Sequence, residues 1–149
     1  LQAVTLSVFG FLLWWVDRKA PNRASETSPS WGAALLMGCA QAVALVPGVS
    51  RSGVTITAGR AAGLPRVAAA RFSFLLATPI TFGAGLLEVE HFRDSASTEV
   101  LIVGMAVSAV VGILAIRGLL HWLGRAGFGA FFAYRLALAA LVLMGAARS

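Results

Sequence analysis

Apolar residues occur along this chain in five runs separated by polar segments. The runs are Leu1–Val16, Trp31–Pro47, Val67–Leu87, Val100–Leu123 and Phe128–Ala147. A helix needs about 20 apolar residues to cross a bilayer, and the last three runs are long enough. We therefore expect membrane-spanning helices over 67–87, 100–123 and 128–147. We also expect one over 1–16 that is truncated at its start.

The second run differs because polar residues interrupt it. Trp31–Pro47 stops at a Pro-Gly pair, and the chain resumes as "VTITAGRAAG" only as far as Gly63. Neither arm can cross a bilayer alone, and a broken helix is tolerated at membrane depth only where protein or water satisfies its backbone. This favours a re-entrant helix-loop-helix hairpin over 31–63 with its tip at "PGVSRSG". The alternative is one long kinked helix.

Composition supports a membrane protein. Of the 149 residues, 58% are hydrophobic and 12% are charged, and the mean hydropathy is +0.84. Soluble domains average about 25% charged residues. Gly104, Ser108 and Gly112 also repeat four apart, the small-residue spacing that lets helices approach closely in lipid. We predict an all-α integral membrane protein, a polytopic helical bundle forming a single membrane domain over 1–149.

The net charge of +6 does not indicate nucleic-acid binding, because the basic residues form no run interleaved with aromatic residues. With the hairpin in place, loop 17–30, the turn near Pro65 and loop 117–127 share one side. That side collects Arg18, Lys19, Arg23, Arg60, Arg66, Arg117 and Arg125. The positive-inside rule makes it cytoplasmic and places the C-terminus outside.

The polar turn "VPGVSRSGVT" has the parts of an anion site. Gly48 and Gly53 allow a tight turn, and a helix starting near Ser52 would aim unpaired N–H groups into it. Arg51 offers a planar fork for two phosphate oxygens. The hydroxyls come from Ser50, Ser52 and Thr55.

Two related motifs do not fit this turn. Val54 stands where a P-loop has its lysine, and Ser52 stands where a nucleophile elbow has its second glycine. A plainer interpretation is that Ser52 caps a helix and Arg51 reaches to an interface. However, an arginine at the tip of a buried hairpin is expensive and favours a functional site.

Other polar residues add little chemistry. The six carboxylates and both histidines lie in loops or at the ends of runs, so no general base and no metal site is expected in this chain. Gln41 is about two helical turns before Gly48 and could support the turn or bond a neighbouring helix. Arg135, about 10 Å inside its run, could brace the site or the bundle. Arg71 is expected to reach to the interface.

The segment "GCAQAVALVPGVSRSGVTITAGRAAGLPRVAAARFSFLLATPITFGAG", from Gly38 to Gly85, resembles the C-terminal signature region of the undecaprenyl-diphosphatase family, also called bacitracin-resistance proteins. The family pattern PGxSRSGxT matches from Pro47 to Thr55 without a gap. The likeness continues through "ARFSFLLATP". The part from Val100 to Ser149 fits more loosely, chiefly through Tyr134 and Arg135.

The resemblance implies a hydrolase of the bacterial inner membrane that converts undecaprenyl diphosphate to the monophosphate used in peptidoglycan synthesis. Its implied fold is an inverted-topology repeat with a re-entrant hairpin in each half. This chain would be the second half, with Ser50, Arg51 and Thr55 as catalytic residues. Gly48, Ser52 and Gly53 would bind the phosphates.

The chain departs from the family in lacking the first half. That half is expected to carry a glutamate-rich motif, a Ser-x-x-His element and the ligands of a divalent cation, Mg²⁺ or Ca²⁺. The chain is therefore either a fragment or a half that works with another chain, and its first residue, Leu1, favours the fragment. A homodimer remains open. Two alternatives also remain: a non-hydrolytic lipid-phosphate binding or transport module, and a purely structural bundle.

Overall fold

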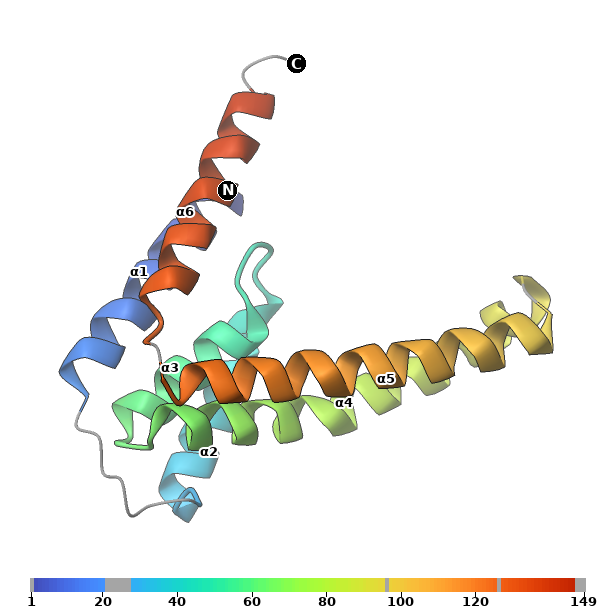
Figure 1. Ribbon diagram of the computed structural model, residues 1–149, viewed down its shortest axis with the longest axis horizontal. Coiled ribbons are helices and arrows are strands. Elements are labelled where there is room, and N and C mark those ends of the chain that lie inside the picture. The colour runs from blue at the N-terminus through green and yellow to red at the C-terminus, as the bar shows by residue number, and fades with distance from the viewer. Residues whose placement is uncertain (1, 21–27, 96, 126, 147–149) are drawn as a thin grey trace.

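Helices make up the computed structural model, which describes residues 2–20, 28–95, 97–125 and 127–146 (Figure 1). Within those ranges there is no strand. The helices are α1 (Gln2–Lys19), α2 (Trp31–Gln41), the 3₁₀ helix η1 (Ala42–Leu45), α3 (Arg51–Ala61), α4 (Arg66–Ser95), α5 (Thr98–Leu123) and α6 (Gly129–Ala146). The all-α prediction is confirmed for this part of the chain.

Apart from α3, which follows the polar turn, each helix lies largely on an apolar run, and several extend beyond it. α1 continues past Val16 to Lys19, and α4 continues past Leu87 to Ser95. The added residues of α4 begin with Glu88, which favours helix and is exposed. Pro79 lies inside α4 and does not end it. Hydropathy therefore located the helices, whereas backbone propensity set their ends.

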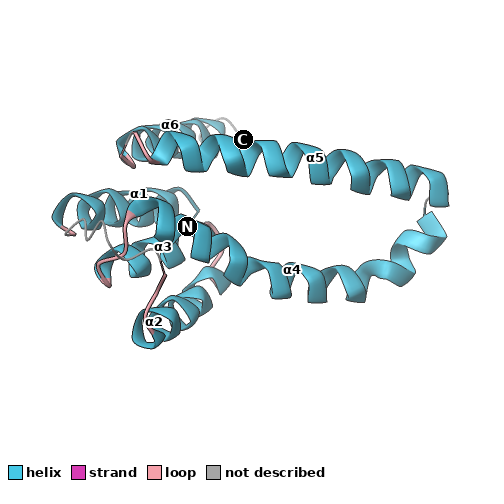
Figure 2. Cartoon of the chain, turned by 60° about the horizontal axis from the view of Figure 1, so that its bottom comes forward, coloured by secondary structure: helices cyan, strands magenta, loops and turns pink. Residues whose placement is uncertain are grey.

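The helices form two groups that meet at α3 (Figure 1). α1 and α6 pack side by side, and α4 and α5 extend together away from the other helices, as Figure 2 also shows. α3 contacts α1, α2 and α4. All its residues from Gly53 to Arg60 are buried, so this short helix is the centre of the fold.

The segment predicted as a hairpin is a helical hairpin with α2 and α3 as its arms. Met37 of α2 packs on Gly59 of α3, and these positions are about equally far from the turn at Gly48. A Cβ at Gly59 would lie 3.0 Å from Met37 Sδ and 3.1 Å from Ala69 Cβ of α4. Only a glycine lets α3 fit this closely between α2 and α4.

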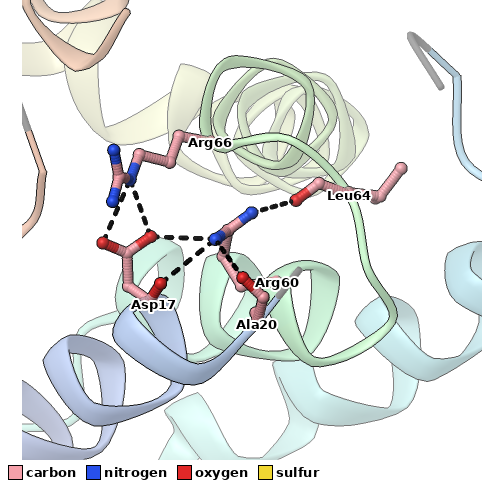
Figure 3. A network of polar contacts seen from close by, with 5 residues as sticks. All are labelled: Asp17, Ala20, Arg60, Leu64 and Arg66. Atoms are coloured by element: carbon pink, nitrogen blue, oxygen red, sulfur yellow. Dashed lines mark hydrogen bonds and ion pairs between the residues drawn. The ribbon is translucent and has the colours of Figure 1, made fainter. Parts of the chain in front are cut away.

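A buried ionic network joins α1, α3 and α4 (Figure 3). Asp17 Oδ1 accepts hydrogen bonds from Arg60 Nε at 2.9 Å and from Arg66 Nε at 2.9 Å. Arg60 also donates to the backbone carbonyls of Leu64 (2.6 Å), Asp17 (3.1 Å) and Ala20 (3.2 Å). Only 1% of the Arg60 side chain and 4% of the Asp17 side chain are exposed, so both charges depend on these partners.

This network places three chain segments at one end of the molecule. The end of α1, the end of α3 and the start of α4 meet at Asp17. Trp122 of α5 and Gly127 line a pocket together with Asp17 and Arg66. The end of α1, the start of α4 and the segment that follows α5 therefore lie close together in the described part of the chain.

Among the residues that the structure describes, two helical segments are long and apolar enough to cross a membrane, namely Arg66–Glu88 within α4 and the whole of α5. Along α5 the apolar side chains are largely exposed, including Val103 (62%), Met105 (64%) and Leu114 (63%). An apolar surface of this extent indicates contact with lipid or with more protein.

Replacing Asp17 with asparagine tests the ionic network. The buried Arg60 guanidinium would lose its counter-charge, and breaking a buried pair costs about 3–5 kcal/mol. We expect Asp17→Asn to lower the thermal unfolding temperature of the purified intact protein markedly. The matched control is Glu99→Gln in the exposed first turn of α5, for which we expect a loss below about 1 kcal/mol. Equal melting of the two variants would contradict the role given to Asp17.

Candidate anion-binding site

The turn between η1 and α3 has the tight geometry that its glycine allows. Gly48 has a φ of 88°, a left-handed conformation that residues with a side chain rarely adopt. Thr5 Oγ1 of α1 donates a hydrogen bond to the carbonyl oxygen of Pro47 at 3.2 Å. The prediction that Gly48 forms the turn is confirmed, and α1 holds that turn from one side.

Helix α3 begins at Arg51, and its cap is Ser50 rather than Ser52. Ser50 Oγ accepts the backbone N–H of Gly53 at 3.2 Å and lies 3.3 Å from Ser52 Oγ. The backbone N–H groups of Arg51 and Ser52 have no acceptor among the described residues, as is usual in a first helical turn. The positive end of the helix dipole therefore points into the turn.

Arg51 is exposed, and its side chain makes no hydrogen bond or ion pair with the described residues. Its guanidinium is therefore available for an anion in front of the helix start. Ser50 and Ser52 are half-buried beside it. The structure thus brings together three of the predicted residues at the start of α3.

Thr55 lies inside the protein, with 0% of its surface exposed. Its Oγ1 donates to the carbonyl oxygen of Arg51 at 3.0 Å and to that of Ser52 at 3.2 Å. The same Oγ1 lies 2.5 Å from Ser73 Oγ of α4. A threonine hydroxyl has one proton, which faces these carbonyls, so Ser73 is the donor in the pair. Thr55 therefore lies beneath the turn, where its hydroxyl is covered by α3 and α4.

Sequence reasoning missed Ser73. It lies in "ARFSFLLATP", a segment that the sequence connects only with the family signature. In the structure 3% of its surface is exposed. A serine within an apolar helix was the available signal, but only the fold shows which hydroxyl it meets.

Arg135 of α6 reaches the same helix start from behind. It is 6% exposed, and its Nη1 is buried with no hydrogen-bond partner in the described part of the chain. A Cβ at Gly53 would lie 3.3 Å from both Nη1 and Nη2 of Arg135. The prediction that Gly53 forms the turn is wrong, because Gly53 lies inside helix α3. Its missing side chain instead leaves room for the Arg135 guanidinium.

Gln41 is the last residue of α2, and its Oε1 is buried without a hydrogen-bond partner among the described residues. No hydrogen bond among the described residues therefore supports the expectation that Gln41 stabilises the turn.

The described residues do not suit a divalent cation. No group of three histidine, cysteine, aspartate or glutamate side chains gathers among them. The carboxylate of Asp17 is already shared by Arg60 and Arg66. A cation of this kind would need ligands from outside the described residues.

These features define a helical, largely apolar protein with an arginine and two serines at the turn before α3. The chain belongs to the family described as bacitracin resistance protein BacA, whose model matches residues 1–141. It is 46% identical over 149 residues to an undecaprenyl-diphosphatase of Pelotomaculum thermopropionicum, covering 99% of this chain and 56% of that protein. It is 43% identical over 143 residues to an undecaprenyl-diphosphatase of Moorella thermoacetica, covering 96% of this chain and 55% of that protein. The chain thus spans about half the length of the curated relatives it matches.

The Thr55–Ser73 contact can be tested by stability. Ser73→Ala leaves the Thr55 oxygen buried without its donor, so we expect the free energy of unfolding to fall by about 1–3 kcal/mol. The control is Thr81→Ala, also in α4, because Thr81 is exposed and only donates to the Ala77 carbonyl of its own helix. A change within about 0.5 kcal/mol is expected there. Thermal unfolding of the intact protein measures both, and a Ser73 variant as stable as the control would refute the contact.

Proposed function

We propose that this chain supplies one half of the active site of an undecaprenyl-diphosphate phosphatase, with the turn at Ser50–Ser52 binding the diphosphate. The observation that carries the proposal is the convergence of two arginines on the start of α3. In front of it, the side chain of Arg51 has no partner among the described residues, and behind it the buried Nη1 of Arg135 has none among them either. The named activity of the relatives at 43% and 46% identity agrees with such a site.

The proposed setting is the bacterial cytoplasmic membrane, with α2 and α3 as a re-entrant hairpin. The Asp17 network supports this, because the end of α1 and the start of α4 lie together on one side of the hairpin. α4 and α5 are long and apolar enough to cross the bilayer. Under the positive-inside rule, the end that carries Arg18 and Arg66 faces the cytoplasm and the C-terminus lies outside. The chain spans 55–56% of the relatives' length, and in this proposal it is the second half of an inverted repeat.

In this proposal each group at the turn has a separate role. Arg51 holds oxygens of the diphosphate with its planar fork, and the free N–H groups of Arg51 and Ser52 bind the same anion. Ser50 and Ser52 contribute hydroxyls. Arg135 supplies a second positive charge in a water-poor site, where charge is least screened. Thr55 and Ser73 fix the first turn of α3, so the donors are already in place when the anion arrives.

The proposed reaction is hydrolysis of the phosphoanhydride. The oxygen of a water molecule forms a bond to the terminal phosphorus, and the bond from that phosphorus to the bridging oxygen breaks. The bridging oxygen stays with undecaprenyl phosphate, and inorganic phosphate is released. The arginines stabilise the charge that develops on the transferred group and on the leaving oxygen. The acid–base group, and any divalent cation, would come from outside the described residues.

A second candidate is a carrier that binds a lipid phosphate without cleaving it. It is favoured by one observation: within the described residues, the groups that contact the turn are donors, hydroxyls and arginines, and none is a carboxylate or an imidazole. A purely structural bundle is disfavoured, because it would not explain why the buried Nη1 of Arg135 has no hydrogen-bond partner among the described residues.

The phosphatase proposal predicts that Arg51 is essential for turnover. We expect Arg51→Ala in the intact protein to reduce the kcat for phosphate release from undecaprenyl diphosphate by about 10²–10³, the usual effect of removing one donor to transition-state charge. Arg51→Lys keeps the charge but loses the fork, and should remain far below wild type.

The matched control is Arg71→Ala, which removes an exposed arginine of α4 that contacts no residue of the turn among the contacts described. Its turnover should stay within a few-fold of wild type. An Arg51→Ala protein with near-normal turnover would end the site assignment. Binding of the lipid without phosphate release by the wild type would select the carrier instead.

The proposed orientation can be tested by labelling. In a Cys39→Ala background, Ser28→Cys precedes α2 and Ser97→Cys precedes α5, and both positions are exposed. We expect an impermeant thiol reagent applied to intact cells to label residue 97 and not residue 28. If the hairpin crossed the bilayer instead, positions 28 and 97 would lie on the same side, and both would react or both would be protected.

A further inference from the structure

A second arginine-lined site lies at the opposite end of α3 from the turn. It is a pocket of about 340 Å³, within the size range of small-molecule sites. Arg18, Arg66, Trp14 and Trp122 line it, together with the first residues of α6. At about 1.5 Å per residue, Arg60 beside this pocket is about 14 Å along α3 from Arg51, so this pocket is separate from the turn.

The charges at this pocket do not balance. Asp17 is the one carboxylate among the lining residues, and it already accepts from Arg60 and from Arg66. Arg18 adds a third guanidinium, which stacks on Trp14 at 4.6 Å from the ring centroid. The two arginines and one carboxylate among the described residues that line the pocket leave a formal charge of +1 there, and that carboxylate is also shared with Arg60. An anion would restore neutrality.

Arg66 has the free donors that such an anion needs. Its Nε donates to both carboxylate oxygens of Asp17, at 2.9 and 3.0 Å. Its terminal nitrogens have no hydrogen-bond acceptor among the described residues, and Nη2 lies 3.3 Å from where a Cβ of Gly127 would be. Asp17 thus orients the guanidinium and leaves its outer edge open, while the start of α6 directs the positive end of its dipole toward the same space.

We propose that this pocket binds a phosphate group, and that its position favours the headgroup of an anionic phospholipid as the source. The pocket lies where α1 ends and α6 begins, at the ends of apolar helices. Tryptophans prefer this level of a membrane, and basic pockets between helices on the cytoplasmic side bind anionic headgroups. The inference uses the proposed membrane placement but does not depend on phosphatase activity.

The test measures lipid retention by the detergent-purified intact protein with native mass spectrometry. Phosphatidylglycerol, phosphatidylcholine and inorganic phosphate are added in separate arms. We expect the wild type to retain phosphatidylglycerol over phosphatidylcholine. Arg18→Gln and Arg66→Gln should each weaken that retention by about tenfold or more, the effect of losing one charge-assisted hydrogen bond.

Two variants serve as safeguards. Arg117→Gln removes an exposed arginine near the same end that does not line the pocket, so its retention should match wild type. Arg18→Gln leaves the Asp17 network intact, so it stays informative if Arg66→Gln unfolds.

Each outcome decides the proposal. If inorganic phosphate binds with the same dependence on Arg18 and Arg66, the pocket is a phosphate site filled from solution. Equal retention of the two lipids without phosphate binding, or equal losses in the Arg18 and Arg117 variants, overturns it. Because no arm measures turnover, failure here leaves the proposed phosphatase function untouched.

Discussion

The carboxylate of Asp17 is the contact on which the arrangement of this chain depends. It is shared by Arg60 at the end of α3 and Arg66 at the start of α4, and it comes from the last turn of α1. Contacts between apolar helix faces do little to select one arrangement of the helices over another, because such faces also pack well against lipid. One buried acceptor with two directional donors gives α3 a defined position, and so places its other end, where Arg51 begins the helix.

The local features of this structure could be read from the sequence. Apolar run lengths located the helices, and the Pro-Gly pair located the turn at Gly48. Contacts between residues far apart in the chain could not be predicted from the sequence, because no periodicity links Thr55 to Ser73 or Gly53 to Arg135. The identity of the cap illustrates the limit: Ser50 and Ser52 have the same chemistry, and only backbone geometry decides that Ser50 accepts from Gly53. The sequence therefore located the turn and its polar residues but not the contacts beneath it.

The two buried arginines differ in how many hydrogen-bond partners they have. Arg60 is fully used, with its donors facing Asp17 and the carbonyls of Leu64, Asp17 and Ala20. Arg135 is about as deeply buried, yet its Nη1 has no partner among the described residues. An unpaired buried charge lowers stability by several kcal/mol and persists where function requires it. Arg60 therefore stabilises the fold, and the cost at Arg135 is the kind that a bound anion would remove.

The chemistry of the turn also limits what it can do without further residues. Arginines, hydroxyls and helix N–H groups bind and polarise a phosphate, but none accepts a proton readily near neutral pH. A site made of such donors is strong in electrostatic stabilisation and lacks general-base catalysis. The carboxylate that the described residues bury, Asp17, is held by two arginines at the far end of α3. In the proposed hydrolysis, the turn binds the diphosphate and proton transfer falls to residues outside the described contacts of the turn.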